Sequence, residues 1–196
     1  MPAGHETEYQ PSLVQGKAHQ FVVLSGCSGG GKSSLLAELG RRGFPIYEEA
    51  GRQVVKEQLY IGGNALPWSD ASQFVELTIS RSIHHMLTAA RSDQLSFFDR
   101  GIVDQVSGLE HLNLPVPQHL LAATDRFRYH EKVFMMPPWP EIFSNDNERK
   151  HSFEDAVSNY ATLLRTYARL GYQIVLVPKL DVSARADFVM NLVNRI

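Results

Sequence analysis

One stretch of the sequence has residue types and spacing suited to binding phosphate groups. The segment from Gly26 to Ser33 reads G-C-S-G-G-G-K-S, which matches the pattern G-x-x-x-x-G-K-[ST] in full. Glycine lets backbone N–H groups converge on a phosphate, because a Cβ atom would obstruct so close an approach. The loop residues expected to surround the phosphates of a nucleotide are Gly26, Ser28, Gly29, Gly30 and Gly31.

The polar residues that close this loop supply a charge and hydroxyl groups. Lys32 can reach the β and γ phosphates, and the Ser33 hydroxyl can coordinate Mg²⁺. A helix expected from Lys32 to about Leu39, with Ser34 in its first turn, adds the partial positive charge of its N-terminus. The loop therefore predicts ATP and Mg²⁺ as ligands. Cys27, the only cysteine, fills a variable loop position and fits a reducing, cytoplasmic compartment.

A second acidic group is expected at the end of a neighbouring strand. The run L-S-F-F-D ends in Asp99, which places a carboxylate at the sheet edge where ligands of open α/β sheets bind. There Asp99 can hold Mg²⁺ or a water bound to it. An ordinary turn aspartate before glycine would have the same local sequence.

The elements that must position these residues alternate between strands and helices. Short apolar runs predict strands within QFVVLS, FPIYEEAGR, LSFFD, KVFMMPP and QIVLVP. Helical periodicity predicts helices over about residues 32–39, 49–60, 71–91, 153–167 and 183–194. This alternation indicates an α/β fold with a parallel sheet covered on both faces. We expect one domain over residues 20–196, preceded by a loosely packed arm over residues 1–19.

Charge and hydropathy exclude several kinds of partner. The formal net charge of -2 provides no positive field that would attract nucleic acid or an anionic membrane. No stretch approaches the roughly 18 apolar residues of a membrane span, and the first residues lack the apolar core of a signal peptide. We expect a soluble protein that binds a nucleotide and a small-molecule acceptor, with its oligomeric state left open.

Five segments of the chain together resemble a known family. They are GCSGGGKSS, YEEAGRQVV, FFDRG, PPWPEIFSNDNERK and VPKLDVSAR. They resemble small bacterial AAA-type ATPase domain proteins, a family related to the nicotinamide riboside kinase domain of NAD-biosynthesis regulators, from about residue 20 to residue 196. The resemblance implies a three-layer P-loop NTPase fold with strand order 2-3-1-4-5 and a kinase-like lid. It also implies Lys32 and Ser33 at ATP and Mg²⁺, Asp99 and Arg100 at the acceptor, Arg149 in the lid, and the loop with Arg185 near the adenine.

Residues that follow two of the predicted strands are expected to line the acceptor pocket. The Asp99-Arg100 pair is similar to the Asp-Arg or Glu-Arg pair of thymidylate and deoxynucleoside kinases, in which the carboxylate acts as base or metal partner and the arginine contacts the acceptor. Glu49 can receive the proton of a substrate hydroxyl and Arg52 can hold a phosphate, although both also suit a helix start.

Two residues of the long helix over 71–91 lie off its buried stripe. Phe74 and Arg81 can therefore reach into the acceptor pocket, where Phe74 would stack on a base. An aromatic contact between two helices is the more common role for such a residue. The polar segment of residues 137–156 is typical of a lid that brings Arg149 to the transferring phosphoryl group. A solvated helix start, with Arg149 paired to Asp146 or Glu148, would have the same sequence.

Three functions are compatible with these motifs. We predict a Mg²⁺-dependent kinase of a nucleoside-like or nucleotide-like small molecule, with Lys32, Asp99, Glu49 and Arg149 as catalytic residues. A regulatory ATPase acting through a protein partner would use the same phosphate loop. A GTPase is suggested by Lys179-Leu180-Asp181, but Pro178 replaces the asparagine of N-K-x-D.

Overall fold

The computed structural model describes residues 9–143 and 152–193, and its centre is a parallel five-stranded sheet. The strands are β1 (Phe21–Gly26), β2 (Ile46–Tyr47), β3 (Ser96–Asp99), β4 (Lys132–Met136) and β5 (Gln173–Leu176). They lie in the order β2-β3-β1-β4-β5, and every neighbouring pair is parallel. The predicted α/β fold and strand order are confirmed.

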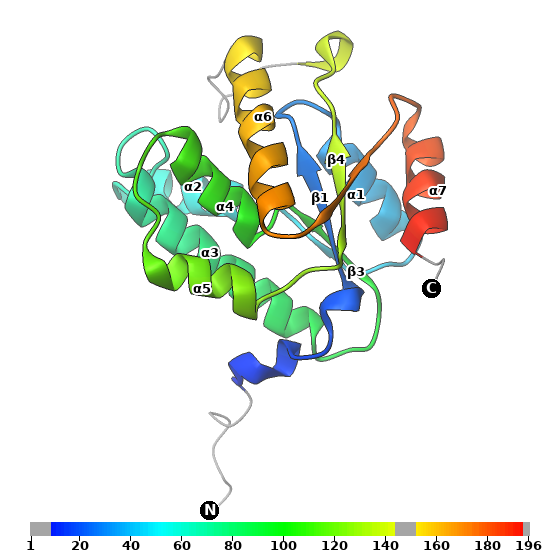
Figure 1. Ribbon diagram of the computed structural model, residues 1–196, viewed down its shortest axis with the longest axis horizontal. Coiled ribbons are helices and arrows are strands. Elements are labelled where there is room, and N and C mark those ends of the chain that lie inside the picture. The colour runs from blue at the N-terminus through cyan, green and yellow to red at the C-terminus, as the bar shows by residue number, and fades with distance from the viewer. Residues whose placement is uncertain (1–8, 144–151, 194–196) are drawn as a thin grey trace, which may run out of the picture.

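Helices cover both faces of the sheet (Figure 1). Their bounds are α1 Lys32–Arg41, α2 Ala50–Ile61, α3 Ala71–Ala89, α4 Ile102–His111, α5 Gln118–Arg126, α6 Phe153–Arg169 and α7 Val182–Val193. Alternate residues of β1 enter two separate cores, because side chains along a strand point to opposite faces. Phe21 and Val23 pack with α3, α4 and α6, whereas Val22 and Leu24 pack with α1 and α7. The molecule therefore has three layers.

Part of the segment expected to form a loose arm packs on the domain. Residues Pro11–Val14 and Ala18–Gln20 form short 3-10 helices. Val14 is buried in the same core as α3, and the Lys17 ammonium donates a 2.8 Å hydrogen bond to the carbonyl oxygen of Ala90. This segment has no periodic pattern of apolar residues, because only one side chain of each short turn is buried. Residues 1–8 lie outside the described part of the chain.

Helix α6 begins at the predicted residue, Phe153, and ends at Arg169, two residues beyond the predicted end. The Ser152 hydroxyl accepts a hydrogen bond from the Asp155 N–H, and the Asp155 carboxylate accepts one from the Ser152 N–H. These reciprocal bonds satisfy donors that a helix N-terminus leaves open. Gly171 follows the helix with a φ of 78°, which suits a helix stop. None of the helices in the described ranges is long and apolar enough to cross a membrane.

Candidate functional site

The phosphate loop joins β1 to α1 and requires glycine at both of its ends. Gly26 has a φ of 119°, and a Cβ atom there would lie 2.3 Å from the carbonyl oxygen of Met136 on β4. Gly31 has a φ of 80° and precedes the first residue of α1. A Cβ atom at Gly31 would lie 2.7 Å from Nη1 of Arg185. The positive φ therefore favours glycine at both positions, and at Gly26 the backbone of β4 also leaves no room for a Cβ atom.

Lys32 and Ser33 are the first two residues of α1 and close the phosphate loop. Lys32 is 4% exposed, and its ammonium donates hydrogen bonds to the carbonyl oxygens of Cys27 (2.8 Å) and Gly26 (3.3 Å). Burial raises the pKa of the Cys27 thiol. The thiol is therefore kept protonated, which agrees with a packing role for Cys27.

Asp99 approaches the loop from the end of β3. Its Oδ2 accepts a 3.2 Å hydrogen bond from the Ser33 hydroxyl. Within the described parts of the chain its Oδ1 is buried and accepts no hydrogen bond. Burial, followed by the nearby Glu49 carboxylate, raises the pKa of Asp99. A buried acceptor without a donor fits a bound cation or its water, so Ser33 and Asp99 suit Mg²⁺.

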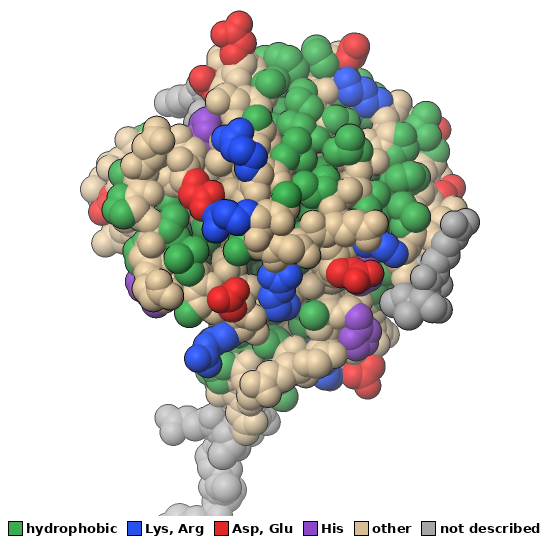
Figure 2. All heavy atoms as spheres, viewed as in Figure 1, with side chains coloured by type: hydrophobic (Ala, Val, Ile, Leu, Met, Phe, Trp, Pro, Cys, Tyr) green, Lys and Arg blue, Asp and Glu red, His purple; other side chains and the backbone are tan. Residues whose placement is uncertain are grey.

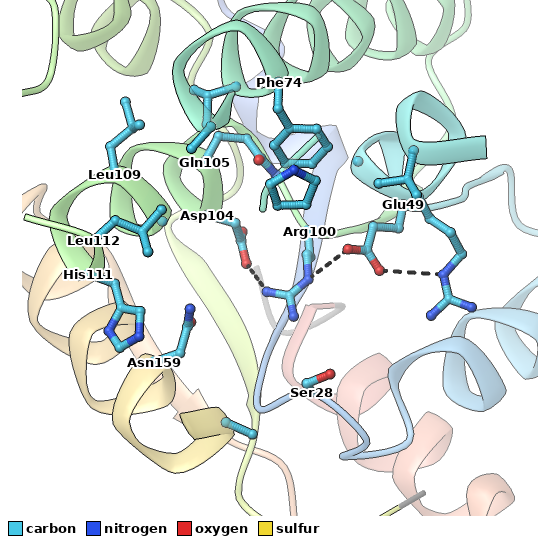
Figure 3. Close-up of a pocket in the computed structure, with 18 of the residues that line it drawn as sticks. Ser28, Glu49, Phe74, Arg100, Asp104, Gln105, Leu109, His111, Leu112 and Asn159 are labelled. Carbon is cyan, nitrogen blue, oxygen red and sulfur yellow. Dashed lines mark hydrogen bonds and ion pairs between the residues drawn. The ribbon is translucent and has the colours of Figure 1, made fainter. Parts of the chain in front are cut away.

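A second group of residues lines a cavity of about 450 Å³ that begins beside the loop at Ser28 (Figure 3). Four predicted positions contribute to the wall, namely Glu49, Arg52, Phe74 and Arg100. The structure does not bring Arg81 to this cavity. The Arg81 guanidinium instead donates a 2.8 Å hydrogen bond to Glu57 and lines a separate hollow between α2 and α3.

Arg100 is held between two carboxylates at the floor of the cavity. Its Nε lies 3.2 Å from Oε1 of Glu49, and its Nη1 lies 3.1 Å from Oδ1 of Asp104. Figure 3 shows the guanidinium between these two side chains. Burial alone would lower the pKa of Arg100, but Glu49, Asp104 and Asp99 outweigh it and raise the pKa. Arg100 is therefore charged under all ordinary conditions.

The backbone at Arg100 has an unusual conformation. Its φ is 67°, in the left-handed region that costs a residue with a side chain about 1–2 kcal/mol. Such strain persists where surrounding contacts determine the position, and it is concentrated at functional sites. The Arg100 N–H donates a 2.9 Å hydrogen bond to the Leu24 carbonyl, which ties the residue to β1.

Glu49 has the position of a helix cap but not its hydrogen bond. It precedes α2, and its side chain makes no capping contact with the backbone of that helix. The carboxylate faces Arg100, and its Oε2 lies 3.9 Å from Nε of Arg52. Glu49 was interpreted either as an acceptor-site residue or as part of a helix start, and the geometry favours a place in the cavity. Phe74 was interpreted either as a pocket residue or as a contact between helices. Both interpretations apply, because it lines the cavity and packs against Gly51 of α2.

Asp104 anchors the cavity floor and was not singled out by the sequence. Its side chain is 1% exposed and accepts hydrogen bonds from Ser25 (2.6 Å), Tyr167 (2.6 Å) and the Gly101 N–H (2.9 Å), besides Arg100. It thereby joins β1, α4 and α6. An aspartate in the first turn of a helix was the available signal, but many capping residues share it.

Arg185 links α7 to the phosphate loop on the other side. Its Nη1 donates a 3.1 Å hydrogen bond to the Gly31 carbonyl, and its guanidinium carbon lies 5.5 Å from the centre of the Trp139 ring. Burial lowers the pKa of Arg185. Ser34 lies in the first turn of α1, while Arg149 lies outside the described residues.

A family comparison agrees with this geometry. Residues 21–185, well over half of the chain, match the family described as AAA domain. The chain belongs to this family. The parallel sheet and the phosphate loop are those of a P-loop NTPase, so this AAA domain belongs to a nucleotide-binding fold. No curated protein matches the sequence.

Solved structures resemble the AAA domain in fold. NadR protein in complex with NR superposes with a TM-score of 0.62 at 15% sequence identity, over 89% of this chain and 50% of the NadR chain. This chain thus spans half the length of that protein. Thymidylate kinase from Ehrlichia chaffeensis superposes with a TM-score of 0.57 at 13% identity, over 89% of this chain and 98% of the kinase.

Alanine substitutions at Gly31 and at Gly43 should distinguish an effect on the packing of the phosphate loop from the general cost of backbone strain. A Cβ atom there meets Arg185 at 2.7 Å, whereas Gly43 has a similar positive φ of 93° with nothing within 4 Å. We expect both alanine variants to lose about 1–2 kcal/mol of stability. Gly31→Ala alone should weaken Mg·ATP binding, by about tenfold or more in titration calorimetry. Equal affinities of the two variants would contradict the importance of the packed loop.

Proposed function

We propose that this AAA domain is a Mg²⁺-dependent kinase that transfers the γ-phosphate of ATP to a small-molecule acceptor. The supporting observation is the cavity of about 450 Å³ beside the phosphate loop, with three carboxylates and two arginines in its wall. Pockets of this size commonly hold a small ligand. A nucleotide switch needs only the phosphate loop, so the cavity favours the kinase over the regulatory ATPase.

The phosphate loop would bind ATP by its backbone and one side chain. The N–H groups at the start of α1 face the phosphates, and the Lys32 ammonium neutralises charge on the β and γ groups. Ser33 and Asp99 would hold Mg²⁺, which when bound offsets further phosphate charge. The described residues contain no cluster of three or more His, Cys, Asp or Glu side chains placed for a metal, so phosphate and water would supply the other ligands. Arg185 and Trp139 would lie near the adenine.

Glu49 is the proposed base for the acceptor. As the acceptor oxygen bonds to the γ-phosphorus, the bond from that phosphorus to the β–γ bridging oxygen breaks and ADP leaves. The acceptor hydroxyl gives its proton to Glu49, whose carboxylate is oriented by Arg100 and Arg52. Arg149 is proposed to reach the transferring phosphoryl group, where a cation stabilises developing charge.

ADP release from Mg·ATP tests this function. The purified protein is assayed alone and with pools of nucleosides, nucleotides and other small alcohols, and Lys32→Ala serves as the blank. We expect one pool to stimulate turnover and to yield a product heavier by one phosphoryl group. Slow turnover that no pool changes, together with tight ATP binding, would instead indicate a regulatory ATPase. Preference for GTP in a competition assay would indicate a GTPase.

A further inference from the structure

The charges in the cavity wall are already balanced by one another. Arg100 uses both sides of its guanidinium, Nε with Glu49 at 3.2 Å and Nη1 with Asp104 at 3.1 Å. Arg52 also faces Glu49, at 3.9 Å. A third carboxylate, Asp155 at the start of α6, also lines the cavity, as does the imidazole of His111 at the end of α4. Carboxylates therefore outnumber guanidinium groups in this part of the wall.

Such a wall is unsuited to a second phosphate. A phosphomonoester carries close to two negative charges and is held by guanidinium groups that offer pairs of N–H donors. For Arg100 to bind one, it would have to leave Glu49 or the buried Asp104, and the displaced carboxylate would then repel the phosphate. Desolvating like charges side by side is costly, so the ion pairs select against an anionic acceptor.

The remaining wall suits a flat ring. Phe74, Leu109 and Leu112 provide apolar surface, and Gln105 and Asn159 provide amide groups that both donate and accept hydrogen bonds. In Figure 3 Phe74 and Gln105 lie above Arg100, and Leu109, Leu112 and Asn159 lie to its left. Phe74 is held against α2, since a Cβ atom on Gly51 would lie 3.1 Å from its ring. A fixed aromatic ring offers a stacking surface for another ring.

We propose that the acceptor is a ring-bearing alcohol of nucleoside size, uncharged or cationic, and that the cavity discriminates against the corresponding monophosphate. This inference rests on the proposed kinase function, because it names the acceptor of that reaction. The ring lies against Phe74 with its polar edge toward Gln105 and Asn159, and its hydroxyl group points toward Glu49. The ion pairs of Arg100 and Arg52 act as the filter against phosphate.

Matched pairs of acceptors test the inference. The wild-type protein is assayed with nucleosides, including the cationic nicotinamide riboside, and with the 5′-monophosphate of each, both for turnover and for binding by calorimetry. We expect kcat/KM to be at least about tenfold higher for a nucleoside than for its monophosphate. Faster turnover of the monophosphates would overturn the inference and leave the kinase function intact.

Glu49→Gln tests the filter itself. Without this carboxylate, Arg100 and Arg52 lose a shared partner, so monophosphate binding should tighten and the ratio of monophosphate affinity to nucleoside affinity should rise by about tenfold in calorimetry. Glu57→Gln is the matched control, because Glu57 pairs with Arg81 outside the cavity. Unchanged monophosphate affinity in Glu49→Gln would overturn the filter, as would failure of both acceptor classes to bind the wild type. Nucleosides that bind without being phosphorylated would support the inference and refute the kinase function.

Discussion

Lys32→Ala should abolish phosphoryl transfer, with a loss of turnover of about a thousandfold or more. Lys32 is the only charged residue between Gly26 and Ser33, and its ammonium already lies within the loop, 2.8 Å from the Cys27 carbonyl oxygen. Phosphoryl transfer is catalysed mainly by positioning and charge stabilisation, so no other loop group can replace this cation. The glycines that shape the loop are unchanged, and the circular dichroism spectrum should remain that of the wild type.

Lys56→Ala provides the matched control for this variant. Lys56 is an exposed residue of α2 and lines neither the phosphate loop nor the cavity beside it. Its replacement should leave ATP turnover within about twofold of the wild type. Unchanged ATP consumption in Lys32→Ala would refute nucleotide binding through the loop, and equal losses in both variants would indicate a general defect.

The sheet could be predicted from the sequence because its strands are buried on both faces. Runs such as QFVVLS and KVFMMPP are short, apolar and bounded by glycine or proline, and these features need no tertiary information. Asp99 followed from the same logic, since the end of a parallel strand lies at the ligand-binding edge. Its bond to Ser33 agrees with that placement.

Helix α4 was not predicted because nearly all of it is buried. Ile102, Val103, Val106 and Leu109 all enter the core, so no polar stripe marks a solvent face. Its β-branched residues and Gly108 also lower intrinsic helix propensity. Missing this helix meant missing Asp104 and Gln105, which the structure places at the floor and wall of the cavity beside the phosphate loop.

Phe74 and Arg81 show that the face of a helix on which a residue lies predicts its place in a pocket only in part. They are seven residues apart on α3 and therefore on similar faces, but about 10 Å apart along the axis. Phe74 reaches the cavity, whereas Arg81 pairs with Glu57 two turns away. Periodicity predicts the direction of a side chain, but the extent of a pocket along the helix depends on how α2 and α4 pack.

Asp104→Asn should lower both stability and turnover. The buried carboxylate accepts hydrogen bonds from Ser25, Tyr167 and the Gly101 N–H and pairs with Arg100. An amide keeps the size but loses the charge and one acceptor, and breaking a buried ion pair typically costs about 3–5 kcal/mol. For a domain of this length the melting temperature should fall by about 6 °C or more. Turnover should also fall, by about tenfold, because Arg100 no longer orients Glu49.

Two comparisons separate these effects of Asp104→Asn. Asp93→Asn removes a carboxylate that pairs with Lys17 on the surface, where solvent screens the charges, so its melting temperature should match the wild type. Tyr167→Phe removes one bond to Asp104 and leaves the ion pair with Arg100, so it should lose stability but little turnover. In Asp104→Asn the KM for ATP should stay constant while kcat falls, because the phosphate loop is untouched. A rise in the KM for ATP with unchanged kcat would show that Asp104 acts on the loop and does not position Glu49 through Arg100.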